Sequence, residues 1–347
     1  MTGLSALDLP QTFQKPSFSV LLTTLQSLEL SPPVWNHSRR RSEILVEQVS
    51  LASRHKAEIT RYISTIIKSP LSWIGDDEQK EVIWELASKR MSERCGRTAM
   101  GELIRSWPFD GVEGQEPFEL VIREPALTGD SLGFKTWGSS YVLARHLPRL
   151  KATSLSTLFD DESSALGGTP TVVELGSGTG LLGLAAAALW RVHVSLSDLP
   201  GIVDNLKSNV MRNRALIEQR GGGLSAGPLT WGGSKDEIDQ ELFGRHHHFK
   251  IVLVADPMYD DDHPALLASA INQQLALDTE SRAVVMVPQR DTTTVRLLGV
   301  FKQAMRHLDR PFSCVEEDEL AGQDDWVEDD EAGNVRCWLG VFSRDRP

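Results

Sequence analysis

A glycine-rich loop is the first feature of the sequence that can bind a ligand. The segment ELGSGTG, residues 174–180, follows an apolar run and precedes a segment with helical character. Glycines let the backbone approach a ligand closely, and the first N–H groups of the following helix are unpaired. The spacing is not the GxGxxG of dinucleotide folds, and the carboxylate of Glu174 would repel a phosphate and suit an ammonium group. The loop therefore favours a ligand that has a cationic group and no phosphate.

Two further residues extend this binding hypothesis. Asp198 ends the next β-rich run, 22 residues after Gly176, where a carboxylate can accept both hydroxyls of a ribose. It could instead cap the helix that begins at Pro200. Trp231, at the end of the third expected strand, could stack on an adenine or pack in the core. A ribose carboxylate and an adenine platform without a phosphate cradle favour S-adenosylmethionine over NAD or ATP, and no GxxxxGK[ST] or GxSxG segment occurs.

A second group of reactive residues follows the fourth expected strand. Asp256-Pro-Met-Tyr259 begins where that strand ends, which is the edge at which open α/β sheets bind ligands. Asp256 could orient an amine, and Tyr259 could wall it or hydrogen-bond to it. Asp and Pro are also ordinary turn formers, so a plain turn is the alternative.

Methyl transfer to a lysine sets opposite demands on such a site. The amine must be neutral and must lie about 3–3.5 Å from the methyl carbon. A carboxylate raises the pKa of the lysine from about 10.4, whereas burial and a nearby cation lower it. Desolvation must therefore prevail, and we assign Asp256 to orienting the amine rather than to strong base catalysis.

The pattern of elements predicts an α/β fold from about residue 130 onward. Short β-rich runs alternate with helical segments, which is typical of a mostly parallel sheet with helices on both faces. The expected strands are 172–175, 192–196, 228–231, 250–255 and 283–287, and the expected helices are 181–190, 200–214, 263–277 and 293–308. Runs 312–315 and 335–342 predict an antiparallel hairpin at one edge.

The N-terminal part has a different pattern. Residues 42–69 and 76–95 carry apolar side chains near a 3.6-residue period, which predicts two helices. The first 35 residues contain four prolines and are expected to be loosely attached. We therefore expect a helical accessory subdomain over 36–117, structural or substrate-docking, and a catalytic domain over 118–347.

Composition restricts the classes of partner. The 347 residues include 36 Lys and Arg against 48 Asp and Glu, a formal charge of −12, which disfavours a protein that grips a polyanion over its whole surface. Ten of the carboxylates lie between Glu316 and Glu331, a stretch expected to be a solvated loop or a surface that steers a basic partner. Three scattered cysteines predict no metal site. The segment MTGLSALDLP lacks the features of a secretion signal, and the longest apolar run is about half of a membrane span, so a cytoplasmic location without membrane contact is expected.

Four segments together resemble a known family. ELGSGTG, SDLP, LTWG and ADPMY have the order and spacing of the seven-β-strand (class I) methyltransferases, specifically the family that includes the DxxY protein-lysine methyltransferases. The resemblance covers about residues 118–343 and implies a Rossmann-like, seven-stranded sheet. Upstream, LGFKTWGSS is similar to the tryptophan-containing segment of that family. The residues that would bind S-adenosylmethionine by this resemblance are Trp137, Gly176, Ser177, Gly178, Asp198, Trp231 and Ala255, with Glu174 added for its charge. Asp256 and Tyr259 match the DxxY positions beside the acceptor nitrogen.

The resemblance also suggests a substrate and leaves alternatives. The segment IWELASKRMSERCGRTA and the run after it are similar to fungal members of the family that modify translation elongation factor 2. This resemblance implies that elongation factor 2 is the protein partner of the chain. Asp-Pro-Met-Tyr also resembles the DPPY tetrapeptide of enzymes that methylate adenine or glutamine, with Met258 in place of the second proline. A methyltransferase acting on nucleic acid or a small amine, and a non-catalytic binding module, therefore stay open. The acidic composition and the short Arg39–Arg41 cluster disfavour nucleic acid.

Overall fold

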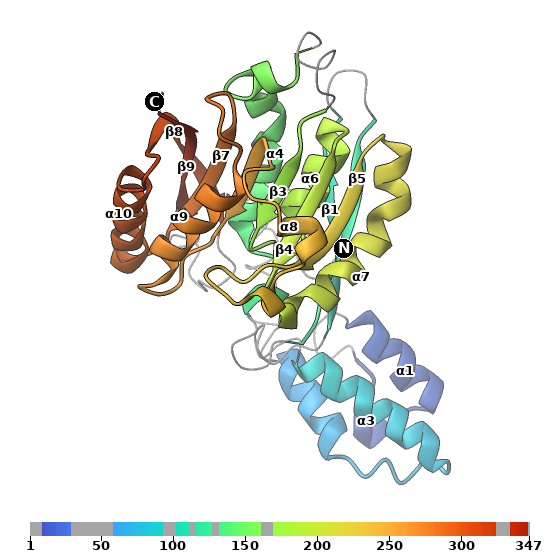
Figure 1. Ribbon diagram of the computed structural model, residues 1–347. Coiled ribbons are helices and arrows are strands. Elements are labelled where there is room, and N and C mark those ends of the chain that lie inside the picture. Colours follow the sequence, from blue (N-terminus) through green and yellow to red (C-terminus); the bar gives the residue numbers. More distant parts are fainter. Residues whose placement is uncertain are drawn as a thin grey trace. The chain divides into compact units, whose positions relative to one another are not determined.

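The computed structural model of the chain describes residues 9–28, 58–92, 102–111, 116–126, 132–160, 169–323 and 334–345. The chain divides into two compact units (Figure 1). The N-terminal unit comprises Met1–Arg105 and Pro125–Asp130, and the sheet unit comprises Ser106–Glu124 and Ser131–Pro347.

The N-terminal unit is helical. It contains a short 3-10 turn, η2 (Thr12–Gln14), the helices α1 (Phe18–Ser27) and α3 (Asp77–Ser92), and a further helical segment over 58–68. Leu21 and Leu25 of α1 are fully buried in a core shared with the other two helical segments, and the buried Arg90 donates through Nε to the Leu25 carbonyl at 2.8 Å. The expectation that the first 35 residues are loosely attached is therefore wrong for residues 9–28, which are packed. The buried apolar face of α1 holds this segment in place although prolines precede the helix. Residues 42–57 and 93–95 of the expected helices lie outside the described residues.

The sheet unit is built on seven strands, which confirms the predicted α/β fold. Their order is β5-β4-β3-β6-β7-β9-β8, with the first five parallel and β9 antiparallel to both of its neighbours. The strands are β3 (Val172–Leu175), β4 (His193–Asp198), β5 (Gly223–Pro228), β6 (Ile251–Ala255), β7 (Arg282–Gln289), β8 (Phe312–Gln323) and β9 (Asn334–Arg344). The predicted hairpin at one edge is present as β8 and β9.

Helices cover both faces of this sheet. One face contacts α4 (Gly138–Ala152), α6 (Leu181–Trp190) and α7 (Pro200–Gln219), and the other packs against α8 (Gln240–Phe243), α9 (His263–Gln274) and α10 (Thr292–Arg306). Short 3-10 turns are η4 (Leu132–Phe134), η5 (Ser156–Leu158) and η6 (Lys235–Glu237). Every residue of α6 is buried, which explains its uniformly apolar sequence. Among the described residues, no helix has both the length and the apolar character that a membrane crossing requires.

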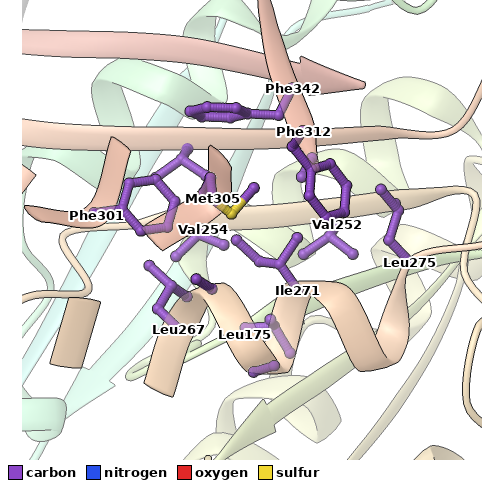
Figure 2. Packing of buried hydrophobic residues seen from close by; sticks show 14 of the residues in the cluster. Leu175, Val252, Val254, Leu267, Ile271, Leu275, Phe301, Met305, Phe312 and Phe342 are labelled. Carbon is purple, nitrogen blue, oxygen red and sulfur yellow. The ribbon is translucent and has the colours of Figure 1, made fainter. Parts of the chain in front are cut away.

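The main core lies between the sheet and the helices α9 and α10. Figure 2 shows Val252 and Val254 of β6 beside Ile271 of α9, with Phe301 of α10 and Phe342 of β9 above them. Phe301 and Phe342 meet edge to face with ring centroids 5.7 Å apart. Complete burial of such side chains contributes roughly 1.5–3 kcal/mol each, so this layer holds β6 and β7 against α9 and α10.

A ladder of side-chain amides fastens a second, smaller sheet to α7. Strands β1 (Leu103–Phe109) and β2 (Phe118–Glu124) form this two-stranded sheet. Asn213 exchanges two hydrogen bonds of 2.9 Å with the backbone of Val121, and Asn209 does the same with Arg123 at 2.8 and 3.0 Å. The spacing of four residues puts both amides on one face of α7, where they replace the strand partner that β2 lacks on that side.

Two sequence predictions about the sheet are wrong. The third strand from the sequence prediction, 228–231, is in fact β5 over Gly223–Pro228. This strand lies at the sheet edge and consists mostly of small residues, so its position follows from its hydrogen bonds with β4 and not from apolar side chains. The acidic stretch is not a loop over 316–323, since these residues belong to β8. Glu317 pairs with Lys302 at 2.6 Å, and Asp318 pairs with Arg149 at 3.1 Å. Residues 324–331 lie outside the described residues.

Candidate active site

The sheet reverses its order beside β3, and this point places the candidate site. From β3 the chain proceeds to β4 and β5 on one side and then returns to β6 and β7 on the other. Open α/β sheets bind ligands beyond the carboxyl ends of the strands at such a reversal. The glycine loop follows β3, Asp198 is the last residue of β4, and Asp256 follows β6. A surface hollow of about 240 Å³ beside His193 and Gly223 lies at the opposite, amino-terminal end of β4 and β5.

The glycine loop has the conformation that its composition predicts. Gly176, Gly178 and Gly180 have φ values of 69°, 55° and 91°, which residues with a Cβ rarely adopt. A Cβ on Gly178 would lie 3.2 Å from the carbonyl oxygen of Gly133. Ser177 joins the loop to β4, because its backbone N–H donates to the Ser197 carbonyl at 2.8 Å and its hydroxyl accepts the Ser197 N–H at 3.1 Å.

Asp198 contacts the glycine loop directly. Its Oδ2 accepts the Gly178 N–H at 2.6 Å, and its Oδ1 accepts the Leu199 N–H at 2.7 Å. The residue at the N-cap of α7 is Leu199, so the alternative that Asp198 caps this helix is wrong. Burial raises the pKa of Asp198, and its two N–H bonds partly oppose this rise. Since a carboxylate offers about four lone-pair positions, two stay available for a pair of hydroxyls.

Glu174 is held at the start of α6. Its side chain is 2 % exposed, and Oε2 accepts the Gly183 N–H at 2.9 Å. Burial raises the pKa of Glu174 from its ordinary value of 4.5 to about 8, although the bond from Gly183 opposes the rise. This contact satisfies one of the unpaired N–H groups in the first turn of α6. The contact of Glu174 with a cofactor ammonium stays a prediction.

Two tryptophans flank the glycine loop and the acceptor segment. Trp231 follows β5 and is partly buried against the main core, and a Cβ on Gly176 would lie 3.3 Å from its ring. Trp137 begins α4, and the preceding Thr136 hydrogen-bonds to Thr179 of the glycine loop with hydroxyl oxygens 2.8 Å apart. The structure therefore brings the segment before α4 onto the glycine loop, as the predicted set of cofactor residues requires.

Asp256 lies directly after β6 in an uncommon backbone conformation. Ala255, the last residue of β6, is half-buried and pairs with Met286 of β7, and Asp256 itself has a φ of 56°. The Asp256 side chain is 4 % exposed and accepts two hydrogen bonds from the Arg290 guanidinium, at 2.8 Å on Oδ1 and 2.5 Å on Oδ2. A non-glycine residue in this region costs about 1–3 kcal/mol and is enriched at functional sites.

Tyr259 is the exposed member of the pair of residues predicted to bind the acceptor amine, Asp256 and Tyr259. Its residue is 43 % exposed, and its ring centroid lies 6.2 Å from that of Trp137 and 5.9 Å from that of His263. Its backbone N–H donates to Nδ1 of His263 at 3.0 Å, which fixes the turn before α9. The exposed surface belongs to the residue as a whole, whereas its phenol group is surrounded by protein. This desolvation, followed by the charge of Asp256, raises the pKa of Tyr259 well above its ordinary value of 10.0, so the phenol stays neutral and can donate or accept a hydrogen bond.

Sequence reasoning missed three residues of this site. Arg290 binds Asp256 and lies with its guanidinium carbon 4.9 Å from the Trp137 ring centroid, while Lys135 places Nζ 4.7 Å from the same centroid. The hydroxyl of Ser139 lies 3.5 Å from Oδ2 of Asp256. Arg290 could have been found, because it follows β7 at the same sheet edge as Asp256. Lys135 and Ser139 lie in the segment LGFKTWGSS that the sequence singled out, but only Trp137 of that segment was assigned to the site.

Comparisons with known proteins show a family and several relatives. Residues 115–303 match the lysine methyltransferase family. Protein-lysine N-methyltransferase EFM2 of Saccharomyces cerevisiae is 33 % identical over 278 residues, which are 76 % of this chain and 61 % of the yeast protein. Protein-lysine N-methyltransferase rrg1 of Schizosaccharomyces pombe is 28 % identical over 303 residues, which are 87 % of this chain and 88 % of that protein. A solved putative transferase of Pyrococcus horikoshii is similar over 77 % of this chain and 85 % of its own, with 13 % identity and a TM-score of 0.39.

The matched range includes the glycine loop, Asp198, Asp256 and Arg290, and thus all the strand ends that form the candidate site. It extends over more than half of the chain. The chain belongs to the lysine methyltransferase family.

Proposed function

We propose that this protein transfers a methyl group from S-adenosylmethionine to the side-chain amine of a lysine in translation elongation factor 2, in the cytoplasm. The observation that carries the proposal is the convergence of the glycine loop and Asp198 with Asp256 and Tyr259 at one edge of the sheet. Membership of the lysine methyltransferase family supports the reaction. The substrate protein rests on the resemblance of the N-terminal segment to fungal members of the family.

The residues around the glycine loop fit the cofactor. The positive φ values of Gly176 and Gly178 give the loop its tight turn at the end of β3, and Asp198 keeps acceptor positions beside it. Trp231 offers an aromatic surface next to Gly176. When bound, S-adenosylmethionine supplies the electrophilic methyl carbon and a positive charge on sulfur. Asp198 would accept the ribose hydroxyls, and Trp231 would lie against the adenine.

The residues after β6 would bind the acceptor amine. Asp256 is fixed by Arg290 and by its own backbone N–H, which donates to the Met286 carbonyl at 2.9 Å, so its carboxylate has a defined orientation. Tyr259 and Trp137 offer aromatic rings that can enclose the aliphatic stem of a lysine and exclude water from the reacting nitrogen. Asp256 accepts an N–H of the amine and directs its lone pair.

Incubation with labelled S-adenosylmethionine and purified elongation factor 2 tests the proposal. We expect label on one or more lysines, identified by mass spectrometry, and a strong reduction of that label with Asp256→Asn. Asp261→Asn is the matched control, because Asp261 is an exposed carboxylate of the same loop that pairs with Arg296. Label found only in nucleic acid or in a small amine would overturn the assignment of substrate.

The cofactor is tested separately by calorimetry. Folded protein is titrated with S-adenosylmethionine and with its demethylated product, and we expect saturable heat with both. Absence of heat with both compounds on folded protein would remove the basis for a methyltransferase and favour a binding module. Heat without any methylation of elongation factor 2 or of a cytosolic extract would favour the same conclusion.

A further inference from the structure

Asp256 after β6 and Arg290 after β7 form an ion pair in the candidate active site. The Arg290 guanidinium binds both oxygens of the Asp256 carboxylate, which is 4 % exposed. The same guanidinium lies over the Trp137 ring. Parallel pairing of Ala255 with Met286 brings the two strand ends side by side, so the two residues leave the sheet at the same edge. A planar guanidinium held on two sides has little freedom, which gives the carboxylate one orientation.

The charge of Asp256 is a difficulty for methyl transfer to lysine. The acceptor nitrogen needs a free lone pair, and an uncompensated carboxylate beside it would stabilise the ammonium form instead. A carboxylate is nevertheless suited to orient an N–H. A cation bound to the far side of the carboxylate reconciles the two demands, because it cancels the charge and leaves acceptor positions free.

We infer that Arg290 is a positioning residue for methyl transfer, which neutralises Asp256 so that the carboxylate aligns the acceptor amine without retaining its proton. This inference rests on the proposed function. The acceptor nitrogen first releases one proton to water. Its lone pair then forms the N–C bond while the S–C bond breaks, and the electrons of that bond stay on sulfur.

The hydrogen bonds of Asp256 leave room for the amine. Arg290 takes one position on each oxygen, and the Ser139 hydroxyl lies 3.5 Å from Oδ2. About four lone-pair positions exist on a carboxylate, so at least one stays for an N–H of the acceptor. The guanidinium and the acceptor therefore need not compete for the same position.

Among the described residues, both cations and carboxylates lie near this pair. Lys135 adds a positive charge on the Trp137 ring, and the Tyr259 phenol is neutral. Asp198 lies at the end of β4 and is bound to the glycine loop. Among the described residues, the groups that face the pair are Lys135 before α4, Asp198 at the end of β4, Tyr259 after β6 and His263 at the start of α9, with Asp260 beside His263. Asp291, directly after Arg290, feels the Arg290 charge and accepts the Thr294 N–H at the start of α10.

The test is the pH dependence of kcat/KM for protein methylation, measured from about pH 6.5 to about pH 9.5 for the wild type and Arg290→Gln. Loss of the guanidinium should move the rising limb to higher pH by about one unit, so that the variant loses roughly ten-fold at neutral pH and regains activity in alkali. Arg290→Lys keeps the charge and should keep the position of the limb, with a lower kcat because the two-oxygen contact is lost. Arg296→Gln, in the exposed pair with Asp261, is the control and should match the wild type.

A uniform fall in kcat/KM of Arg290→Gln without movement of the limb would show a purely structural role and overturn the inference. Asp256→Asn gives an independent check that does not depend on the folding of Arg290→Gln. Here the guanidinium is uncompensated, so the limb of the residual activity should move to lower pH, and an unmoved limb would contradict the inference. An inactive wild type with bound cofactor would instead count against the proposed function, so the two failures can be told apart.

Discussion

The amide ladder between α7 and β2 gives the sharpest prediction about stability. Asn209 has no exposed surface, and its side chain binds three backbone groups. Oδ1 accepts the Arg123 N–H at 2.8 Å, and Nδ2 donates to the carbonyls of Arg123 and Thr179 at 3.0 and 2.9 Å. Substitution of Asn209 by Leu, which is similar in size, would remove all three contacts without leaving a large cavity.

The magnitude follows from the groups that lose a partner. A buried backbone N–H or C=O without a hydrogen bond costs about 1–3 kcal/mol. The Arg123 carbonyl keeps a weaker bond from Asn205 at 3.4 Å, so the loss there is partial. We therefore expect Asn209→Leu to lower the free energy of unfolding by roughly 3–5 kcal/mol. This is a large share of the about 5–15 kcal/mol of a typical domain.

Hydrogen exchange and urea unfolding measure this effect at two scales. Amide exchange followed by mass spectrometry on a peptide that covers β2 should show lost protection at Arg123, and the urea midpoint should fall. Because Thr179 belongs to the glycine loop, the affinity for S-adenosylmethionine should fall as well. Asp204→Leu, at an exposed position of the same helix, is the control and should change stability by no more than about 0.5 kcal/mol.

The reasoning fails if Asn209→Leu unfolds within about 0.5 kcal/mol of the wild type and protection of β2 is unchanged. Packing of the buried Leu120 and Ile122 would then hold β2 in place, and the amides would be incidental.

Three further predictions concern the cofactor side of the site. The pKa of Glu174 is about 8 in the folded chain and 4.5 ordinarily, so between these pH values the folded chain holds a proton that the unfolded chain has lost. The free energy of unfolding should therefore fall by up to about 5 kcal/mol as the pH rises from 4.5 to about 8. Glu174→Gln should remove this decline, and a difference in urea midpoint between variant and wild type that is equal at about pH 5 and about pH 8.5 would contradict it. Trp231→Ala should weaken binding of S-adenosylmethionine by about five- to a hundred-fold in calorimetry, and an unchanged Kd in a folded variant would place Trp231 in the core alone. Asp198→Asn should weaken binding by roughly ten- to a hundred-fold through loss of charge-assisted bonds to the ribose, and a Kd equal to that of the wild type would rule out this contact.

Local patterns predicted most of the catalytic half. Helix α6 and strand β3 begin and end at the predicted residues. The glycine loop separates the end of β3 from the start of α6, and the apolar run that follows it spans α6, so the boundaries depend on neighbouring residues only. The resemblance to the lysine methyltransferases is confirmed. Strand β5 was missed because a sheet edge needs little hydrophobicity, so its small residues give no signal of their own.

The acidic stretch shows what composition leaves open. Its ten carboxylates predict a solvated loop, and Glu317 does keep an exposed side chain and Asp318 a partly exposed one, but both lie on β8 and pair with cations of α10 and α4. Arg149, the partner of Asp318, is 169 residues away in the sequence, and only the packing of α4 against the sheet edge brings the two together.

By itself, the sequence determined the α/β class, most strands and helices from the glycine loop onward, the glycine loop itself, and the acidic residues at the strand ends, since each depends on neighbours along the chain. The tertiary structure alone decided that Arg290 binds both oxygens of Asp256, that Asp198 binds the loop instead of capping a helix, and that asparagines of α7 complete the hydrogen bonds of β2. The physical reason is that a charge or an amide is satisfied by whichever partner lies within about 3 Å, and chain folding chooses that partner.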